Sequence, residues 1–157
     1  MDVPATLREV PFGSGRYHEA CQARDRILRR PLGLRLSEAD RQGESDQRHF
    51  ILEEHGRLVG GVIALPDRPG VVRLRQMWIE SERAGHGLGR RLLEELARSL
   101  EAERVEQLVL HARAPVLGFY RKCGFREEGP EFTEVGIPHR KMRRTLSRET
   151  RSPGDRR

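Results

Sequence analysis

The feature of this sequence that most constrains its fold is a glycine-rich loop directly before an amphipathic run, SERAGHGLGRRLLEEL at residues 81–96. Leucines at helical spacing give the run one apolar face, namely Leu88, Leu92, Leu93, Leu96 and Leu100,. A plain helix begins at a Ser, Asp or Asn cap, and a tight turn into a helix needs one glycine. Three alternating glycines, Gly85, Gly87 and Gly89, instead indicate that a ligand approaches the backbone there,.

A loop that opens a helix favours an anionic ligand. The first helical N–H groups have no partner inside the helix, and the helix dipole adds partial positive charge at this end. The sequence therefore predicts a phosphate-binding loop, and the alternative is a turn without a ligand. A P-loop is excluded because Arg90 and Arg91, rather than Lys and Ser or Thr, follow Gly89,. A dinucleotide-binding motif is excluded because Arg90 stands where its third glycine belongs,.

Hydrophobic periodicity predicts an α/β fold around a mixed sheet of about six to seven strands, flanked by helices. One strand–helix–strand crossover runs from Val71 to Ala112, with hairpins before and after it,. The expected strands cover residues 6–12, two segments of 48–65 around a turn at His55–Gly56, 71–80 after a turn at 66–70, 105–112, 125–132 and 139–146,. The expected helices cover residues 16–30, 37–44 with Ser37 as the cap, the run after the glycine loop, and 114–123,.

Composition places the chain among single-domain globular proteins. Its 157 residues are 36% hydrophobic and 34% charged, and this length suits one domain with a sizeable core. The longest weakly polar run, Val59–Pro66, is too short to span a membrane, and the N-terminus has no signal-peptide pattern,. We therefore expect a cytoplasmic protein with no membrane partner, in which Cys21 and Cys123 stay reduced.

The chain is basic, and all but two of its 30 basic residues are arginines. Arginine suits contacts with phosphate or carboxylate, although solvated surface arginines are the simpler interpretation. Acidic residues are interleaved with the arginines and aromatic residues make up only 5%, so a nucleic-acid-binding groove is not favoured,. Residues 147–157 form a basic end, which we expect to be a disordered tail,.

Two motifs resemble the signatures of the GNAT N-acetyltransferases. The segment RLRQMWIESERAGHGLGRRLLEEL (residues 73–96) resembles the acetyl-CoA-binding motif Q/R-x-x-G-x-G/A. The segment APVLGFYRKCGF (residues 114–125) resembles the second signature, a helix that bears Tyr and is followed by Gly-Phe. DQRHFIL (46–52) and EFTEVGIPHRKM (131–142) are similar to segments of the ElaA-like branch. The resemblance implies a GNAT acyl-CoA N-acyltransferase fold and a single domain over residues 1–146.

The resemblance implies acyl transfer from the thioester of acetyl-CoA to an amine, without a metal. It assigns the pyrophosphate to backbone N–H groups of residues 85–90, and the polarisation of the thioester carbonyl to an N–H within Met77–Ile79. It makes Tyr120 the general acid that protonates the departing thiolate, and packing beside Phe119 is the alternative. The cofactor-binding residues implied are Met77, Trp78, Ile79, Gly85, His86, Gly87, Leu88, Gly89 and Arg90.

The chain departs from the family pattern at two positions. Ala84 stands at the Q/R position of the motif, with Arg83 one residue early, and Arg113 stands where many members have Asn. A cradle of backbone N–H groups does not depend on the side chain at position 84, so acetyl-CoA is still the expected ligand.

The attacking amine must be neutral, so a general base is expected. The candidates are His49, His111, Glu134 and His139. The sequence around Pro138 is expected to aim Glu134 and His139 at an acceptor pocket beside the last hairpin. For each histidine the alternative is a structural role, such as a hydrogen bond to a backbone carbonyl.

The sequence thus predicts an N-acetyltransferase that moves an acetyl group from acetyl-CoA to a primary amine. The alternative is a non-catalytic acyl-CoA-binding or nucleic-acid-associated protein that uses the basic tail. Tyr120 and the complete glycine loop favour the enzyme. The acceptor, a small molecule or a protein, and a homodimer are left open.

Overall fold

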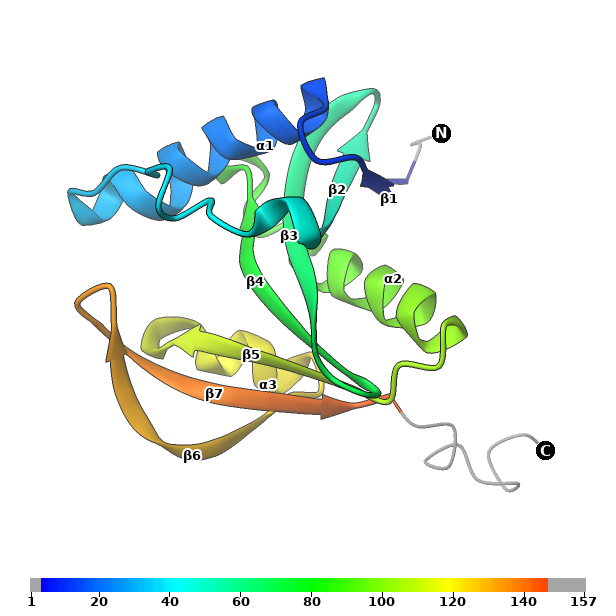
Figure 1. The fold of residues 1–157 in the computed structure, drawn as a ribbon, viewed down its shortest axis with the longest axis vertical. Helices are drawn as coiled ribbons and strands as arrows, with labels where there is room; N and C mark the ends of the chain where they lie inside the picture. Colours follow the sequence, from blue (N-terminus) through cyan, green and yellow to red (C-terminus); the bar gives the residue numbers. More distant parts are fainter. Residues whose placement is uncertain (1–3, 147–157) are drawn as a thin grey trace. The chain divides into compact units, whose positions relative to one another are not determined.

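The computed structural model describes residues 4–146, in which seven strands pair in the order β1-β2-β3-β4-β5-β7-β6 (Figure 1). The strands are β1 (Thr6–Val10), β2 (Arg48–Glu54), β3 (Arg57–Arg68), β4 (Val71–Ile79), β5 (Gln107–Arg113), β6 (Arg126–Glu134) and β7 (Ile137–Thr145). The α-helices are α1 (Gly15–Arg24), α2 (Leu88–Ala102) and α3 (Leu117–Lys122). The predicted mixed sheet is confirmed, and so is the crossover, because β4 and β5 pair in parallel. The predicted tail, residues 147–157, lies outside the described residues.

The described chain divides into two compact units. Unit 1 consists of residues 4–65 and 75–96, and it holds β1, β2, α1 and the glycine loop. Unit 2 consists of residues 66–74 and 97–146, and it holds β5, α3, β6 and β7. The apolar face predicted for α2 is confirmed, because its leucines are at most 6% exposed.

Helix α1 begins at a side-chain cap and ends in turns of other types. The Ser14 hydroxyl accepts the N–H of Tyr17 at 3.2 Å, which satisfies one of the free donors at the helix start,. After Arg24 the chain continues as a π-helical turn, η1 (Asp25–Arg29), and then a 3₁₀ turn that ends at Gly33 with φ 75°. The helix predicted over residues 16–30 is therefore confirmed in place, although its second half is not α-helical.

The short helix predicted at residues 37–44 is wrong, because these residues form turns and only η3 (Glu44–Asp46) is a 3₁₀ turn. The Asp40 carboxylate accepts the N–H and the hydroxyl of Ser37, at 2.9 and 3.1 Å. The Ser37 hydroxyl in turn accepts the N–H of Asp40 at 3.1 Å, so Ser37 caps this segment in the reciprocal pattern of a capping box,. The next backbone bonds, from Arg41 N–H to Glu38 and from Gln42 N–H to Ala39, each span only three residues, so the capped segment continues as turns and not as an α-helix. Gly43 then takes a left-handed φ of 84°, and the chain turns so that the Glu44 side chain enters the interior of unit 1.

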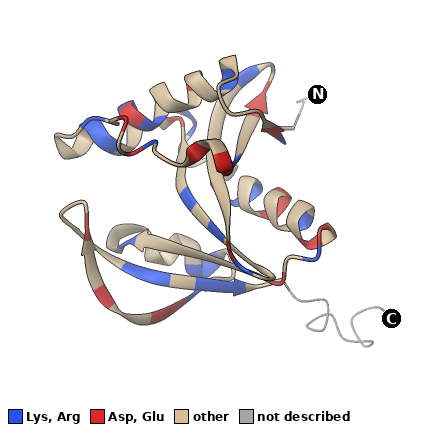
Figure 2. Cartoon of the chain, viewed as in Figure 1, with Lys and Arg blue, Asp and Glu red and all other residues tan. Residues whose placement is uncertain are grey.

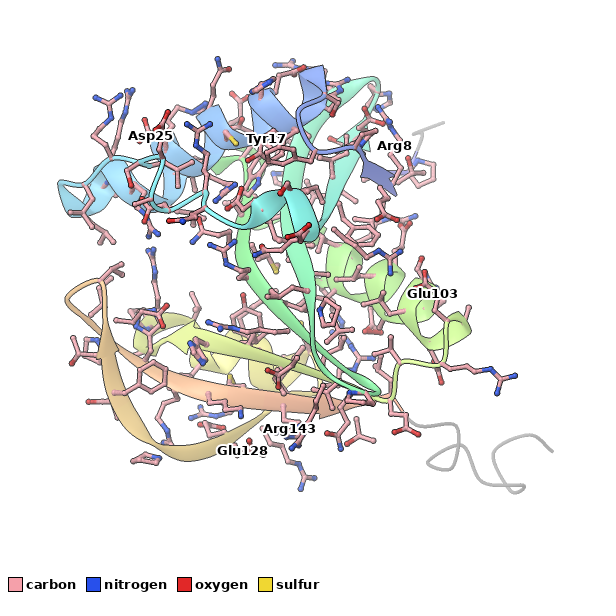
Figure 3. The ribbon with its side chains drawn as sticks, in the orientation of Figure 1. Arg8, Tyr17, Asp25, Glu103, Glu128 and Arg143 are labelled. Atoms are coloured by element: carbon pink, nitrogen blue, oxygen red, sulfur yellow. The ribbon has the colours of Figure 1, made fainter. Side chains whose placement is uncertain are left out.

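Glu44 is fully buried, and three side chains donate hydrogen bonds to its carboxylate. Arg24, which is 2% exposed, donates to both oxygens at 2.9 and 2.6 Å. The Tyr17 hydroxyl (labelled in Figure 3) donates at 2.8 Å and Arg75 Nη1 at 3.1 Å. Burial alone would raise the pKa of Glu44, but the hydrogen bonds and charge of Arg24, with the other donors, lower it to about 2. We call Tyr17, Arg24, Glu44 and Arg75 the Glu44 cluster.

Unit 2 is built on the β6–β7 hairpin, with β5 paired to β7. The β5–β7 pairing is antiparallel over Gln107–Arg113. Across the hairpin, Glu128 accepts from Arg143 Nε at 2.7 Å and lies 3.4 Å from Lys141 Nζ (Figures 2 and 3). Glu128 of β6 thus lies opposite Lys141 of β7 and next to Arg143, and such cross-strand pairs of opposite charge stabilise an antiparallel hairpin,.

One hairpin turn matches the prediction made from the sequence, and another is shorter than predicted. His55 and Gly56 both have positive φ, 54° and 75°, as a two-residue β2–β3 turn requires,. Strand β3 continues to Arg68, so the turn predicted at residues 66–70 is shorter than expected. Two residues suffice there, because Gly70 has a left-handed φ of 78°.

We expect Glu44→Gln to lower the free energy of unfolding by about 3–5 kcal/mol near pH 7, because it leaves the Arg24 charge buried without its carboxylate. The folded-state pKa of Glu44, about 2, is below its ordinary value of 4.5. The wild-type advantage is therefore complete above pH 4.5 and is lost as the pH falls towards 2,. Urea unfolding of both proteins at a series of pH values measures this gap.

The control for this prediction is Glu128→Gln, which breaks an ion pair on an exposed hairpin. We expect it to change the free energy of unfolding by less than about 1 kcal/mol, because solvent screens surface ion pairs. A gap between wild type and Glu44→Gln that does not vary with pH would contradict the charge-based explanation.

Candidate active site

The glycine loop lies in unit 1, between the end of β4 and the start of α2. Gly85 and Gly87 have φ values of 80° and 76°, in the left-handed region that disfavours any residue with a Cβ,. Both are exposed, and Leu88, the first residue of α2, is buried and anchors the helix. The path of the backbone is therefore sufficient reason for glycine at these two positions.

Gly89 needs a different explanation. It is the second residue of α2 and is not among the glycines with positive φ. Glycine inside a helix is less stable than alanine by about 1 kcal/mol, so the backbone conformation does not require it. Arg91 N–H donates to the Gly87 carbonyl at 3.0 Å, so the N–H groups of residues 88–90 precede the first bond of the helix,. A glycine at this point allows a ligand to approach those N–H groups closely.

The residues flanking the loop explain how the departure from the family motif is accommodated. Arg83, one residue before the Q/R position, donates to Glu54 at 2.9 Å. Ala84, Gly85, His86 and Gly87 are exposed, and so is Arg90. Arg83 is thus paired with a carboxylate of β2, while the backbone of the loop and the side chains of His86 and Arg90 are exposed to solvent.

The segment Met77–Ile79 is held against two glycines of β3. A Cβ on Gly61 would lie 2.7 Å from Trp78 Nε1, and a Cβ on Gly60 would lie 2.7 Å from Ile79 Cδ1. Trp78 is 3% exposed. The absence of side chains at positions 60 and 61 therefore lets the end of β4 pack closely, and the packing fixes the position of this segment within unit 1.

Tyr120 lies on α3 in unit 2, on a helix that begins with a 3₁₀ turn at Ala114–Val116 and ends at Gly124 (φ 93°). Its ring packs edge-on against Phe125, which is 1% exposed, with ring centroids 5.7 Å apart. Burial, and secondarily the charge of Cys123, raise the pKa of Tyr120 to about 12, while Arg113 acts to lower it. The phenol therefore carries its proton at neutral pH, as a general acid must.

Three of the four candidate bases come together in unit 2. His111 Nδ1 lies 2.9 Å from Glu134 Oε1, and His139 Nε2 lies 3.9 Å from Glu134 Oε2. The pairing of β5, β7 and β6 produces this arrangement, because Arg113 lies opposite His139 and Glu134 lies opposite Ile137. One carboxylate thus lies between two imidazoles.

The two histidines beside Glu134 differ in exposure and in partners. His139 is 3% exposed, and its Nδ1 lies 2.8 Å from the Ile137 carbonyl. This is the structural arrangement that the sequence offered as the alternative for a histidine. The His111 side chain is 27% exposed and that of Glu134 is 44% exposed, so solutes can reach this pair.

Sequence reasoning missed two residues that contact this group. Arg73 Nη2 lies 3.2 Å from His111 Nδ1. That ring nitrogen cannot accept from Arg73 and donate to Glu134 at once, so the two contacts belong to different tautomers. Phe132 packs between the histidines, with ring centroids 4.9 Å from His111 and 5.9 Å from His139. The only indication in the sequence that Arg73 and Phe132 could reach this group was the alternation of side chains between the two faces of strands β4 and β6.

His49, the fourth candidate base, belongs to unit 1. It is 5% exposed, its Nε2 lies 2.7 Å from the Glu44 carbonyl, and its ring packs edge-on against Tyr17 at 4.8 Å. These contacts favour a structural role beside the Glu44 cluster.

Three further findings concern the whole described range. Among residues 4–146, no group of three or more His, Cys, Asp or Glu residues is arranged to hold a metal ion. No helix in the same part of the chain has the length and apolar character to cross a membrane. Cys21 and Cys123 are both buried, and neither is in a disulfide bond.

Comparison with known proteins identifies the family. Residues 34–146 match the family described as "Acetyltransferase (GNAT) domain". The IAA acetyltransferase of Azospirillum brasilense is 32% identical over 89 residues, which cover 54% of this chain and 58% of that protein. The crystal structure of Escherichia coli ElaA matches with a TM-score of 0.75 at 20% identity, over 90% of this chain and 99% of that one. A GNAT family acetyltransferase from Elizabethkingia anophelis, with acetyl-CoA bound, matches with a TM-score of 0.70 at 14% identity, over 90% and 97% of the two chains.

The family match covers most of the sequence, so the chain belongs to the GNAT acetyltransferase family. It is an acyl-CoA-dependent N-acetyltransferase, as the glycine loop and the Tyr-bearing signature predicted. The similarity to the solved structures, at 20% identity or less, shows a shared fold, which includes that of ElaA. The GNAT fold uses acetyl-CoA as acetyl donor, and one of these neighbours holds it.

We predict that Gly89→Ala stabilises the free protein by about 0.5–1 kcal/mol, because alanine is the better helix residue. If Gly89 serves ligand approach, the same change reduces the rise in melting temperature that acetyl-CoA causes by binding the folded state. Differential scanning fluorimetry with and without acetyl-CoA measures both effects.

Gly15→Ala is the matched control, since Gly15 lies in the first turn of α1 and a Cβ there meets nothing within 4 Å. It should stabilise the free protein and leave the acetyl-CoA shift unchanged. An intact shift in Gly89→Ala would mean that the ligand does not approach α2 at this residue.

Proposed function

We propose that residues 1–146 act as one domain that transfers the acetyl group of acetyl-CoA to a primary amine of a small molecule or a protein. The observation that carries the proposal is the 2.9 Å contact between His111 and Glu134, which supplies an accessible base in the same unit as Tyr120. The expected location is the cytoplasm, which supplies acetyl-CoA.

The backbone of unit 1 would hold and polarise the donor. The N–H groups of Leu88, Gly89 and Arg90 at the start of α2 would bind the pyrophosphate, helped by the helix dipole. An N–H within Met77–Ile79 would donate to the thioester oxygen, where negative charge develops as the amine adds. The close packing of this segment on Gly60 and Gly61 supports the assignment, because such a donor must not move during the reaction.

The base we propose is His111. With its Nδ1–H donated to Glu134, the Nε2 lone pair is free to take a proton from the acceptor amine,. The carboxylate fixes the ring orientation and the tautomer, as the third group of a catalytic triad does. Glu134 is therefore a positioning residue in this scheme, and buried His139 supports the hairpin.

The reaction balances with these groups. The amine nitrogen bonds to the carbonyl carbon and gives one proton to His111. The C–S bond then breaks, and Tyr120 donates its proton to the thiolate. The products are the acetylated amine and free CoA thiol. The raised pKa of Tyr120 makes it a weak acid. After the reaction Tyr120 recovers its proton from solvent or from protonated His111.

A thiol-release assay with acetyl-CoA and a panel of amines tests the proposed function, and Tyr120→Phe tests the acid. We predict that this variant lowers kcat by about 10²–10⁴-fold, the range for a positioned proton donor, with the acetyl-CoA thermal shift retained. Phe119→Leu, next to Tyr120, controls for loss of ring packing and should change kcat far less. If Tyr120→Phe turns over normally, Tyr120 has a packing role.

A second prediction separates the two histidines. His111→Gln should lower kcat/KM for the amine by about 10²-fold or more, since Gln cannot take the proton. Glu134→Gln should give a smaller loss. His139→Gln should melt earlier while acetylating normally, because its ring bonds the Ile137 carbonyl. The opposite result, slow acetylation by His139→Gln with unchanged melting, would assign the base to His139.

A further inference from the structure

Two adjacent residues of strand β4 reach the buried ion pair between Arg24 and Glu44. Arg75 Nη1 donates to Glu44 at 3.1 Å and to Gln47 at 2.9 Å. The Gln76 side-chain oxygen accepts from Arg24 Nε at 3.3 Å. Adjacent side chains of a regular strand point to opposite faces of the sheet. A regular strand would therefore not bring Arg75 and Gln76 to the same buried cluster.

The backbone conformation of Gln76 explains how both side chains reach the same cluster. Its φ is 55°, in the left-handed region that a residue with a Cβ rarely occupies,. The other non-glycine residues with positive φ in the described chain lie in turns, and Gln76 alone lies inside a strand. A left-handed residue interrupts the alternation, as in a β-bulge, so two consecutive side chains reach one side. Such strain persists only where the surroundings hold it.

The side chain of Gln76 contacts a buried ion pair whose geometry is fixed by hydrogen bonds. Glu44 is 0% exposed and Arg24 2% exposed, and the two form a bidentate ion pair. A buried ion pair is seldom more stabilising than apolar residues of the same shape, so stability alone does not explain it. The pair does fix geometry, because each hydrogen bond has a preferred direction and the buried charges penalise any arrangement that separates them.

The segment directly after Gln76 carries the proposed thioester donor. The N–H of Met77 belongs to the peptide that joins it to Gln76, so the conformation of Gln76 sets the direction of that peptide. On the other side, a Cβ at Gly60 would lie 3.1 Å from the Trp78 carbonyl, which shows how closely β3 approaches. The Glu44 cluster and the β3 glycines together hold residues 76–79.

We propose that the Glu44 cluster holds the left-handed conformation of Gln76 and thereby aims one N–H within residues 77–79 at the thioester carbonyl. Arg24, Glu44, Arg75 and Gln76 are positioning residues in this view, and none of them touches the substrate. The inference rests on the proposed function, because it requires a thioester beside β4.

The test compares two substitutions at Gln76 that remove the same side-chain contact. Glycine adopts φ 55° without strain, whereas β-branched valine resists it. We expect Gln76→Gly to keep kcat within about threefold of wild type. We expect Gln76→Val to lose about 10–100-fold in kcat, the scale of a small misplacement of a catalytic group. The KM for acetyl-CoA should change by less than about threefold in both variants, because the pyrophosphate loop is untouched.

A second pair of variants tests the link to the cluster. Arg75→Met releases β4 from Glu44 and leaves the buried Arg24 pair in place, so it should fold. We expect kcat to fall about tenfold, and we expect the added change Gln76→Gly to restore it, because glycine needs no support to hold the left-handed backbone. Arg8→Met, which breaks an exposed ion pair with Glu53 in the same unit, is the control and should leave kcat unchanged.

The outcomes separate the two proposals. An active wild type in which Gln76→Gly and Gln76→Val have equal kcat overturns the inference and leaves the proposed function standing. So does an Arg75→Met variant that melts earlier with normal kcat, or whose loss Gln76→Gly does not restore. A wild type that transfers no acetyl group to any amine overturns the proposed function and the inference with it. Should Gln76→Val not fold, the Arg75→Met pair decides.

Discussion

The buried carboxylate of Glu44 is the interaction on which much of unit 1 depends. A charge removed from water is tolerated only if it is paired and hydrogen-bonded, and here the donors come from α1 and β4. The 3₁₀ turn that carries Glu44, the end of α1 and the middle of β4 must therefore come together in one arrangement. Apolar contacts alone would allow small shifts between these segments, whereas directed hydrogen bonds to one carboxylate do not.

The glycine loop combines two separate requirements. Gly85 and Gly87 allow the left-handed φ values that the chain needs on its path from β4 to α2. Gly89 satisfies no backbone requirement and weakens the helix it lies in, which is understandable if a ligand needs the space. The family relationship identifies acetyl-CoA as the donor that the GNAT fold uses. A helix start with free N–H groups is chemically suited to its pyrophosphate.

Unit 2 shows how sheet register can assemble a polar group from distant positions. His111, Glu134 and His139 come from three strands, and only their antiparallel pairing brings the carboxylate between the imidazoles. The two rings then differ in environment, since His139 bonds the Ile137 carbonyl in the interior and His111 is accessible. This difference in exposure is the physical basis for assigning them different roles.

The sequence by itself determined the features that rest on local physics. The glycine loop, the leucine face of α2 and the two-residue turn at His55–Gly56 were predictable, because side-chain periodicity and turn chemistry act between near neighbours. The helix predicted at residues 37–44 was wrong, because the segment that Ser37 caps continues with three-residue turns and ends at Gly43, whose φ is left-handed. Only the tertiary structure decided the burial of Glu44 and the left-handed backbone of Gln76. Both depend on partners 20 to 52 residues away, and no local pattern records which distant donor a buried carboxylate will find.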